Sequence, residues 1–145
     1  MTLATLCPFR TGKLATVQKP LYITYQNWYT LFMEPILAVK FFANSLGTEP
    51  VRDWLKSLVA IDRKTIGEDI KTVQLGWPLG MPLVGHLGGG LWEVRTKLDN
   101  RIARVLFVLD GSTMVLLHGF IKKQQVTPKP DLDLAKERMK ELKRG

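Results

Sequence analysis

Hydrophobic and polar positions follow the clearest pattern between Leu91 and Lys123, in the stretch LWEVRTKLDNRIARVLFVLDGSTMVLLHGFIKK. Two turn signals, Asp99-Asn100 and Asp110-Gly111, divide this stretch into three runs rich in Val, Leu, Ile and Phe. Short apolar runs separated by such turns are typical of an antiparallel meander. The three predicted strands are 91–98, 101–109 and 113–121.

The first of these runs alternates in character along its whole length. Side chains at every second position point to the same face of a strand. One set is mostly apolar (Trp92, Val94, Thr96, Leu98) and the other is charged (Glu93, Arg95, Lys97). We therefore expect one face to pack on a core and the other to carry charge. The second run is apolar on both faces after Arg104, which predicts a central strand.

The region before the meander predicts a strand and two helices. Residues 36–42 are apolar and β-favouring, and they predict a first strand. Thr48 is the predicted N-cap of a helix whose apolar residues recur at i, i+3, i+4 and i+7. That apolar set is Val51, Trp54, Leu55 and Leu58.

A second helix is predicted to begin at Asp62 as its N-cap, with Ile61 and Ile66 forming a hydrophobic staple. Its buried stripe is Ile66, Ile70 and Val73, and Gly76 ends it. The two short helices should form a hairpin against the sheet.

The remaining segments are a loop and a last helix. Residues 80–90 are rich in glycine and predict a loop that leads into the meander. After Pro128 and Pro130, an apolar stripe predicts a C-terminal helix that packs on the domain. The stripe is Leu132, Ala135, Met139 and Leu142. The order of elements indicates an α+β fold: a strand, a helical hairpin, an antiparallel sheet and a C-terminal helix.

Residues 1–32 differ from the rest, because they lack periodicity and contain no acidic residue. We interpret them as an extension outside the compact domain, which covers 33–145. A start codon assigned too early, with Met33 opening the domain, and a transit peptide are the alternatives. A signal peptide is disfavoured, because Arg10 and Lys13 follow the short apolar stretch.

The net charge, the cysteine count and the length of the apolar runs limit which functions the chain can have. The chain of 145 residues has a formal net charge of +8 and a single cysteine, and no apolar run approaches the ~20 residues that span a bilayer. A basic excess favours an anionic partner such as nucleic acid or a ribosome. One cysteine excludes an internal disulfide and fits the cytoplasm. No membrane association is expected.

Candidate chemistry gathers around the meander. Between His86 and Lys123 there are six Lys or Arg and three Asp or Glu residues. No carboxylate or histidine spacing predicts a metal site, so we expect neither metal nor cofactor. Such cations could cleave RNA through its own 2′-hydroxyl, with a base, an acid and positive charge at the phosphate. Lys122 and Lys123 are expected at a solvated strand end, where mutual crowding would lower a lysine pKa. His118 and His86 are the other titratable groups, and His118 could equally be a packed histidine.

The same residues lie in segments that resemble a known protein family. The segments EPVRDWLKSL, IGEDIKTVQLGWPLGMPLV, LWEVR, RIARVLFV and LLHGFIKK followed by TP resemble the RelE/ParE superfamily toxins, specifically the phage-derived, HigB-like branch of type II toxin–antitoxin systems. The resemblance runs from about residue 36 to the end. It implies a ribosome-dependent endoribonuclease that cuts mRNA and is silenced by a cognate helix-turn-helix antitoxin.

The resemblance also implies site residues. Arg95 would contact the scissile phosphate, and Lys122 and Lys123 would be catalytic or bind phosphate, with His118 as a further catalytic candidate. For Arg104 the resemblance implies either a catalytic role or a role in positioning the RNA backbone. The charge pattern itself adds His86, Lys97 and Arg101, so the expected RNA-binding residues are these three and Arg104. The chain lacks the C-terminal tyrosine of some relatives, so that role falls to His118 or Phe120 or is absent. The alternatives are a ParE-like inhibitor of DNA gyrase without nuclease activity and an inactive RNA-binding remnant.

Overall fold

The computed structural model describes residues 34–122 and 126–145. The chain divides into two units, Met1–Glu34 and Pro35–Gly145, and every element given below belongs to the second. The predicted extension over 1–32 and the candidate Lys123 lie outside the described residues, so both stay predictions. No helix among the described residues is long and apolar enough to cross a membrane.

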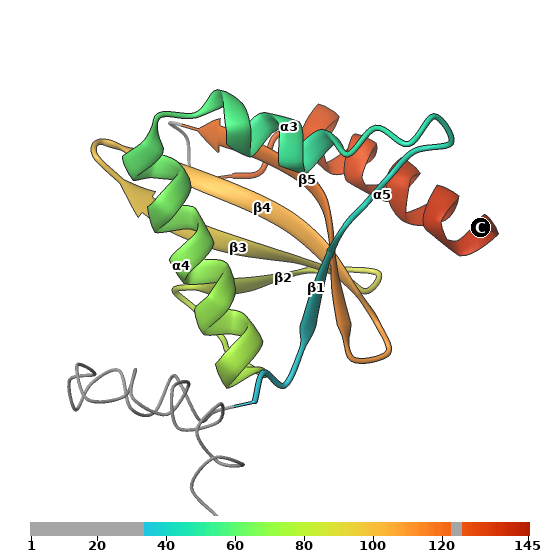
Figure 1. Cartoon of the computed structure of the whole chain (residues 1–145), viewed down its shortest axis with the longest axis horizontal. Coiled ribbons are helices and arrows are strands. Elements are labelled where there is room, and N and C mark those ends of the chain that lie inside the picture. The colour runs from blue at the N-terminus through green and yellow to red at the C-terminus, as the bar shows by residue number, and fades with distance from the viewer. Residues whose placement is uncertain (1–33, 123–125) are drawn as a thin grey trace, which may run out of the picture. The chain divides into compact units, whose positions relative to one another are not determined.

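A five-stranded sheet forms the centre of the second unit (Figure 1). Its strands, in spatial order, are β1 (Ala38–Phe41), β5 (Thr113–Lys122), β4 (Arg101–Asp110), β3 (Leu91–Leu98) and β2 (Val84–Gly88). β1 runs parallel to β5, and all other neighbours are antiparallel. The predicted meander is confirmed, because β3, β4 and β5 pair consecutively through tight turns. The predicted α+β fold is confirmed as well.

Helices cover both faces of this sheet. Two consecutive helices, α3 (Pro50–Ser57) and α4 (Ala60–Gly76), pack on one face, and α5 (Lys129–Arg144) packs on the other. α3 contacts mainly β5, whereas α4 contacts mainly β3. We refer below to the α3/α4 face and the α5 face. The two predicted helices of the hairpin thus lie over different strands.

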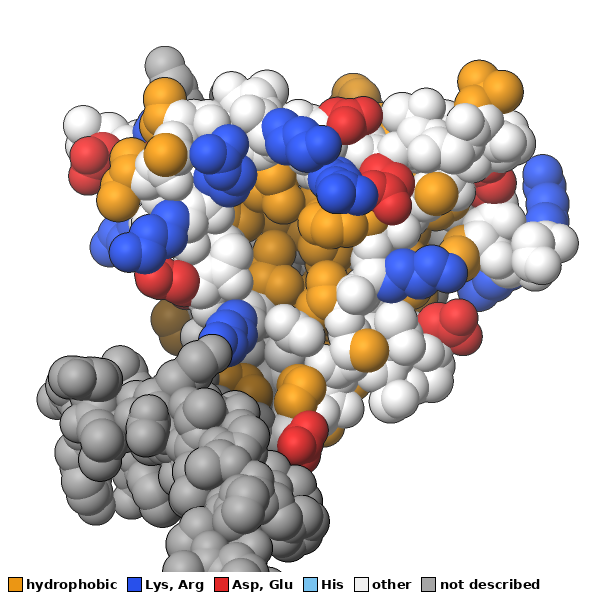
Figure 2. All heavy atoms as spheres, in the orientation of Figure 1, with side chains coloured by type: hydrophobic (Ala, Val, Ile, Leu, Met, Phe, Trp, Pro, Cys, Tyr) orange, Lys and Arg blue, Asp and Glu red, His pale blue; other side chains and the backbone are white. Residues whose placement is uncertain are grey.

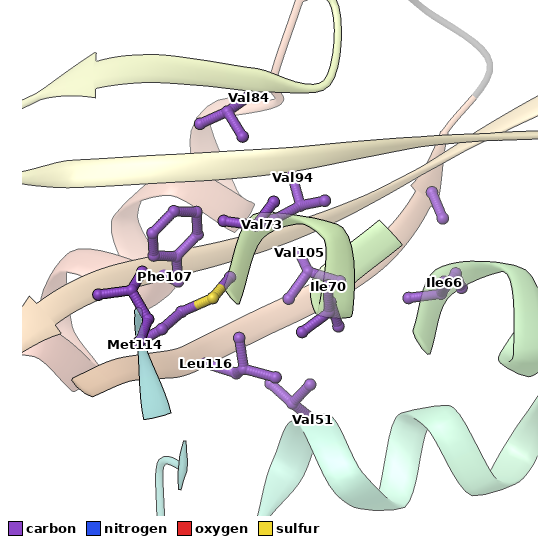
Figure 3. Packing of buried hydrophobic residues seen from close by; sticks show 12 residues of the cluster. Val51, Ile66, Ile70, Val73, Val84, Val94, Val105, Phe107, Met114 and Leu116 are labelled. Carbon is purple, nitrogen blue, oxygen red and sulfur yellow. The ribbon is translucent and has the colours of Figure 1, made fainter. Parts of the chain in front are cut away.

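The larger core lies on the α3/α4 face (Figure 3). The predicted stripe of α4 is confirmed, since Ile66, Ile70 and Val73 are buried against the sheet. They meet side chains such as Phe107 and Leu116 from the central strands. On this same face, Figure 2 shows hydrophobic side chains in a recess with Lys and Arg side chains beside it. The predicted stripe of α5 is also confirmed, and it packs on the α5 face.

Both predicted helix starts were wrong. Thr48 is not an N-cap: α3 begins at Pro50, and the Thr48 amide donates to Asn44 Oδ1 in the preceding turn. α4 begins at Ala60, so Asp62 lies inside its first turn and is buried. Ile61 is 66% exposed, so no staple forms with Ile66. Asp62 instead binds a strand residue, an interaction that local sequence patterns do not contain.

The predicted loop over 80–90 was also wrong in part, because it contains the edge strand β2. Glycine is unfavourable in strands, but backbone pairing with β3 outweighs that preference here. Gly85 lies opposite Glu93, and a Cβ at Gly85 would lie 3.0 Å from Glu93 Oε1. The glycine therefore makes room for the side chain of Glu93.

A β-bulge in β5 changes which side chains meet α5. Leu106 pairs with His118 and Phe107 pairs with Leu116, so Leu117 is an extra residue on β5. As a result, Leu117 joins the α5 core and the next residue, His118, also bonds to α5. The bulge thereby sets the register of the basic strand end.

Candidate functional site

Most of the predicted site residues share the α5 face of the sheet. Residues that pair across strands point to the same face, and the face alternates along each strand. Arg95 pairs with Arg104, Arg104 pairs with Phe120, and Lys97 and Lys122 both pair with Ile102. The sheet therefore brings Arg95, Lys97, Arg104, His118 and Lys122 to one face. We call Glu93, Arg95, Arg104 and Lys122 the basic cluster.

A buried carboxylate lies at the centre of the basic cluster. Glu93 has no exposed side-chain surface. Its Oε1 accepts from Arg95 Nε at 2.6 Å, and Arg104 Nη1 lies 3.0 Å from its Oε2. The Thr127 hydroxyl accepts from Arg104 Nη1 at 2.7 Å and donates to Glu93 Oε2 at 3.1 Å. One carboxylate thus fixes two guanidinium groups side by side.

The charged face of β3 therefore differs from the prediction. Glu93 and Arg95 were expected to carry charge opposite the core, yet the pair lies in a mostly buried network. The two arginines differ in access, since 29% of the Arg95 side chain is exposed and only 3% of the Arg104 side chain. An anion in solvent can contact the side chain of Arg95 directly. The buried side chain of Arg104 can attract that anion only electrostatically, without touching it. A guanidinium stays protonated in either position.

Lys122 is buried, which contradicts the expectation of a solvated strand end. Its side-chain Nζ has no hydrogen-bond partner among the described residues. Burial lowers the pKa of Lys122 below its ordinary value of 10.5, and the positive charge of Arg104 lowers it further. The cause of the lowered pKa is thus mainly burial, and the predicted crowding by Lys123 stays a prediction. A buried amine beside arginines is a group that can lose its proton more easily than an ordinary lysine.

His118 binds α5 through both of its ring nitrogens. Nε2 lies 2.7 Å from Asp131 Oδ1, and Nδ1 lies 3.3 Å from Arg138 Nη1. Arg138 Nη1 also donates to the Leu117 carbonyl at 2.8 Å. Because Arg138 can only donate, this geometry makes Nδ1 an acceptor and leaves the proton on Nε2. His118 stacks on Phe120 as well. His118 therefore resembles a packed, hydrogen-bonded histidine, which was the alternative to a catalytic role.

Open space adjoins the basic cluster where β3 and β5 end and β4 begins. Arg95 and Lys97 line one hollow, and Lys97 and Lys122 line a second. Ile102 lines both, so the two hollows adjoin. Lys97 itself is exposed. An anionic chain lying along these hollows would meet the cations of three strands.

His86 lies outside the basic cluster, and Arg101 adjoins it only as a residue that lines the second hollow together with Lys97 and Lys122. Arg101 lies on the α3/α4 face, where its Nη2 is 2.8 Å from Asp62 Oδ2, so it ties β4 to the start of α4. His86 pairs with Trp92, its ring lies 4.4 Å from that indole, and it is exposed. Trp92 packs against the α3/α4 core. RNA binding by Arg101 and His86 stays a prediction.

Sequence reasoning missed the residues that organise the site. Glu93 was expected only on a charged, solvated strand face, and Thr127 and Arg138 were given no role. The sequence does place Glu93 two positions before Arg95, on the same face of the strand, but it gives no sign that Glu93 is buried. Thr127, Asp131 and Arg138 follow β5 at separations that only the folded chain brings together. Among the described residues, no group of three or more His, Cys, Asp or Glu could hold a metal ion.

The fold and the basic cluster together define a small α+β domain with paired arginines on a sheet. A comparison with family models matches residues 53–140 to the family described as phage-derived protein Gp49-like (DUF891). The match covers more than half of the chain, so the chain belongs to the Gp49-like family, a family of RelE/ParE-like toxins. No curated protein matches the chain in a sequence comparison.

Proposed function

We propose that this protein is the toxin of a type II toxin–antitoxin system and acts as a ribosome-dependent mRNA endoribonuclease of the HigB-like branch. The observation that carries the proposal is the basic cluster, in which a buried carboxylate fixes Arg95 and Arg104 beside Lys122. Membership in a family of RelE/ParE-like toxins supports the toxin role. The cleavage is proposed to be independent of metal.

Arg95 is the residue proposed to bind the scissile phosphate. Its partly exposed guanidinium lines a hollow, while Glu93 restrains its Nε edge. Arg104 lies deeper and adds positive charge without leaving Glu93. A restrained guanidinium needs little reorganisation when charge grows on a phosphate oxygen, and this preorganisation lowers the barrier.

Lys122 is proposed as the general base. A lowered pKa raises the fraction of neutral amine that can accept a proton near neutral pH. The 2′-hydroxyl oxygen attacks the adjacent phosphorus, its proton passes to Lys122 Nζ, and the bond from phosphorus to the 5′-oxygen breaks. The departing 5′-oxygen takes up a proton from solvent water, which completes the proton balance. The products are a 2′,3′-cyclic phosphate and a 5′-hydroxyl end, and Lys123 would add charge at the same strand end.

The proposed partners follow from this role. A ribosome would present the mRNA, and a cognate helix-turn-helix antitoxin would silence the toxin in the cytoplasm. The net charge of +8 suits both ribosomal RNA and an acidic protein partner.

The proposal is tested with purified full-length protein, ribosomes and one defined mRNA. We expect cleavage only when the mRNA occupies the ribosome, in the presence of a chelator, with cyclic phosphate and 5′-hydroxyl ends. A matched pair of variants distinguishes loss of the site from loss of one positive charge. Arg95→Ala should abolish cleavage, and Arg52→Ala, at an exposed helix position, should not. Intact mRNA under all conditions, with inhibition of gyrase supercoiling instead, would contradict the proposal.

A further inference from the structure

A hollow at the edge of the sheet differs in character from the rest of the basic surface. It is lined by Asp69 of α4, by Pro82 and Leu83 before β2, and by side chains of β3 and β4. Those from the strands are Arg95, Lys97 and Ile102. Its volume of about 400 Å³ lies within the range of small-ligand sites.

The hollow exists because β2 is shorter than β3. Pairing between the two strands ends at Val84 and Val94, and the Arg95 amide still donates to the Leu83 carbonyl at 2.8 Å. Beyond this point β2 no longer accompanies β3. α4 approaches the same edge, so Asp69 and Arg95 line one space.

Its lining combines two kinds of surface. Pro82, Leu83 and Ile102 supply apolar walls, and Ile102 is 36% exposed although it lies on a central strand. Asp69 forms no ion pair and accepts no hydrogen bond on its carboxylate within residues 34–122 and 126–145. An unused carboxylate beside apolar walls and two cations is suited to a flat, polar-edged group attached to a phosphate.

We propose that this hollow binds one nucleobase of the RNA next to the phosphate held by Arg95, and that Asp69 selects the base. The inference rests on the proposed function. Single-stranded RNA is read mainly through the edges and faces of unstacked bases. Leu83 and Ile102 would contact the faces of the base, while Asp69 would accept hydrogen bonds from its edge.

The hydrogen-bonding chemistry of the Asp69 carboxylate determines which nucleobase the hollow should prefer. Guanine presents two adjacent donors, N1–H and the 2-amino group, which match the two carboxylate oxygens. Adenine and cytosine each offer one amino group. Uracil offers an N–H between two carbonyl oxygens that repel a carboxylate. A well-placed bidentate contact discriminates by about 5- to 150-fold, so guanine should bind best and uracil worst.

The test measures binding without cleavage. Full-length protein is titrated into fluorescent 2′-O-methyl hexanucleotides of sequence UUNUUU, in which N is each base in turn. We expect the guanine oligonucleotide to bind at least about 5-fold more tightly than the uracil one. Asp69→Asn should remove this difference, because its amide presents a donor where guanine has one. Asp53→Asn, an exposed helix position with the same change in net charge, should preserve it.

Equal affinities for the four oligonucleotides, a base preference that survives in Asp69→Asn, an equal loss in Asp53→Asn, or no binding at all would each overturn the proposal. Failure of the proposed nuclease has a different signature, since it leaves ribosome-bound mRNA intact whatever the oligonucleotides do. The two hypotheses can therefore fail separately.

Discussion

The carboxylate of Glu93 and the guanidinium of Arg104 form an ion pair at 3.0 Å in which the side chains are 0% and 3% exposed. Both charges are removed from water, so each depends on the other and on the groups around them. Arg95 and Thr127 complete this network from β3 and from the segment before α5. The network links the sheet to the C-terminal segment at the candidate site.

Glu93→Gln should destabilise the domain strongly. The substitution keeps the shape of the side chain but leaves the buried charge of Arg104 without its carboxylate, which typically costs about 3–5 kcal/mol. Urea unfolding measures the loss. Glu68→Gln, at a position whose side chain is 65% exposed, serves as the control and should change stability by no more than about 0.5 kcal/mol. Equal stability of the two variants would show that the buried network contributes little.

Lys122→Met should remove activity without unfolding the protein. Methionine fills the space of the buried chain and lacks the amine, so cleavage should fall by about 10²- to 10⁴-fold while the fold persists. A lysine replaced at an exposed position, as in Lys56→Met, should keep activity. Full activity of Lys122→Met would exclude this lysine as the base.

The same variant should change how stability depends on pH. The folded pKa of Lys122 lies below the ordinary value of 10.5, so between these two values the unfolded chain binds more protons than the folded one. Stability conferred by neutral Lys122 therefore rises with pH through that window. Relative to Lys122→Met, the wild-type protein should gain stability as pH increases toward 10.5. A constant difference across the window would contradict the lowered pKa.

His118→Ala should loosen α5. The change leaves Asp131 and Arg138 without the ring that both contact, and a lost buried hydrogen-bond partner costs about 1–3 kcal/mol. Amide hydrogen exchange should accelerate across α5 more than in β3 and β4. His86→Ala provides the matched control because that ring lies on the other face. Unchanged exchange in α5 would indicate that the contacts with His118 do not hold the helix.

Gly119→Ala should destabilise the α3/α4 core. A Cβ at Gly119 would overlap the ring of Trp54, and overpacking of this kind typically costs about 1–3 kcal/mol. Trp54→Leu should relieve the overlap, so the double variant should lose less than the sum of the single variants. In Gly67→Ala, on an open part of α4, stability should instead rise by about 0.5–1 kcal/mol. Additive losses would show that the ring yields without strain.

Strong local periodicity made much of the fold predictable. The strand at β3, the turns at Asp99-Asn100 and Asp110-Gly111, and the stripes of α4 and α5 all have local sequence signals, and each is confirmed. β2 was missed because its glycines oppose strand formation and only pairing with β3 stabilises it. The start of α4 was misplaced because Asp62 binds Arg101, 39 positions away, instead of capping its own helix.

Only the cationic residues of the site could be predicted from the sequence. Arg95, Arg104 and Lys122 were identified from charge and from the resemblance, but the burial of Lys122 depends on how the strand end packs. Glu93 and Thr127 meet across 34 positions, and no local pattern predicts that contact. The sequence therefore indicated which charged residues belong to the site. Which of them are held by ion pairs, buried or exposed to solvent depends on contacts that form only in the folded chain.

RNA end mapping in bacteria that express the full chain tests the central claim most directly. Cells that produce the wild-type protein should show new 5′-hydroxyl ends within translated reading frames and should stop growing. Cells that produce Arg95→Ala, verified as folded by thermal melting, should show no such ends, and cells that produce Arg52→Ala should match the wild type. Growth arrest by the wild-type protein with intact mRNA, or continued cleavage by folded Arg95→Ala, would contradict the account.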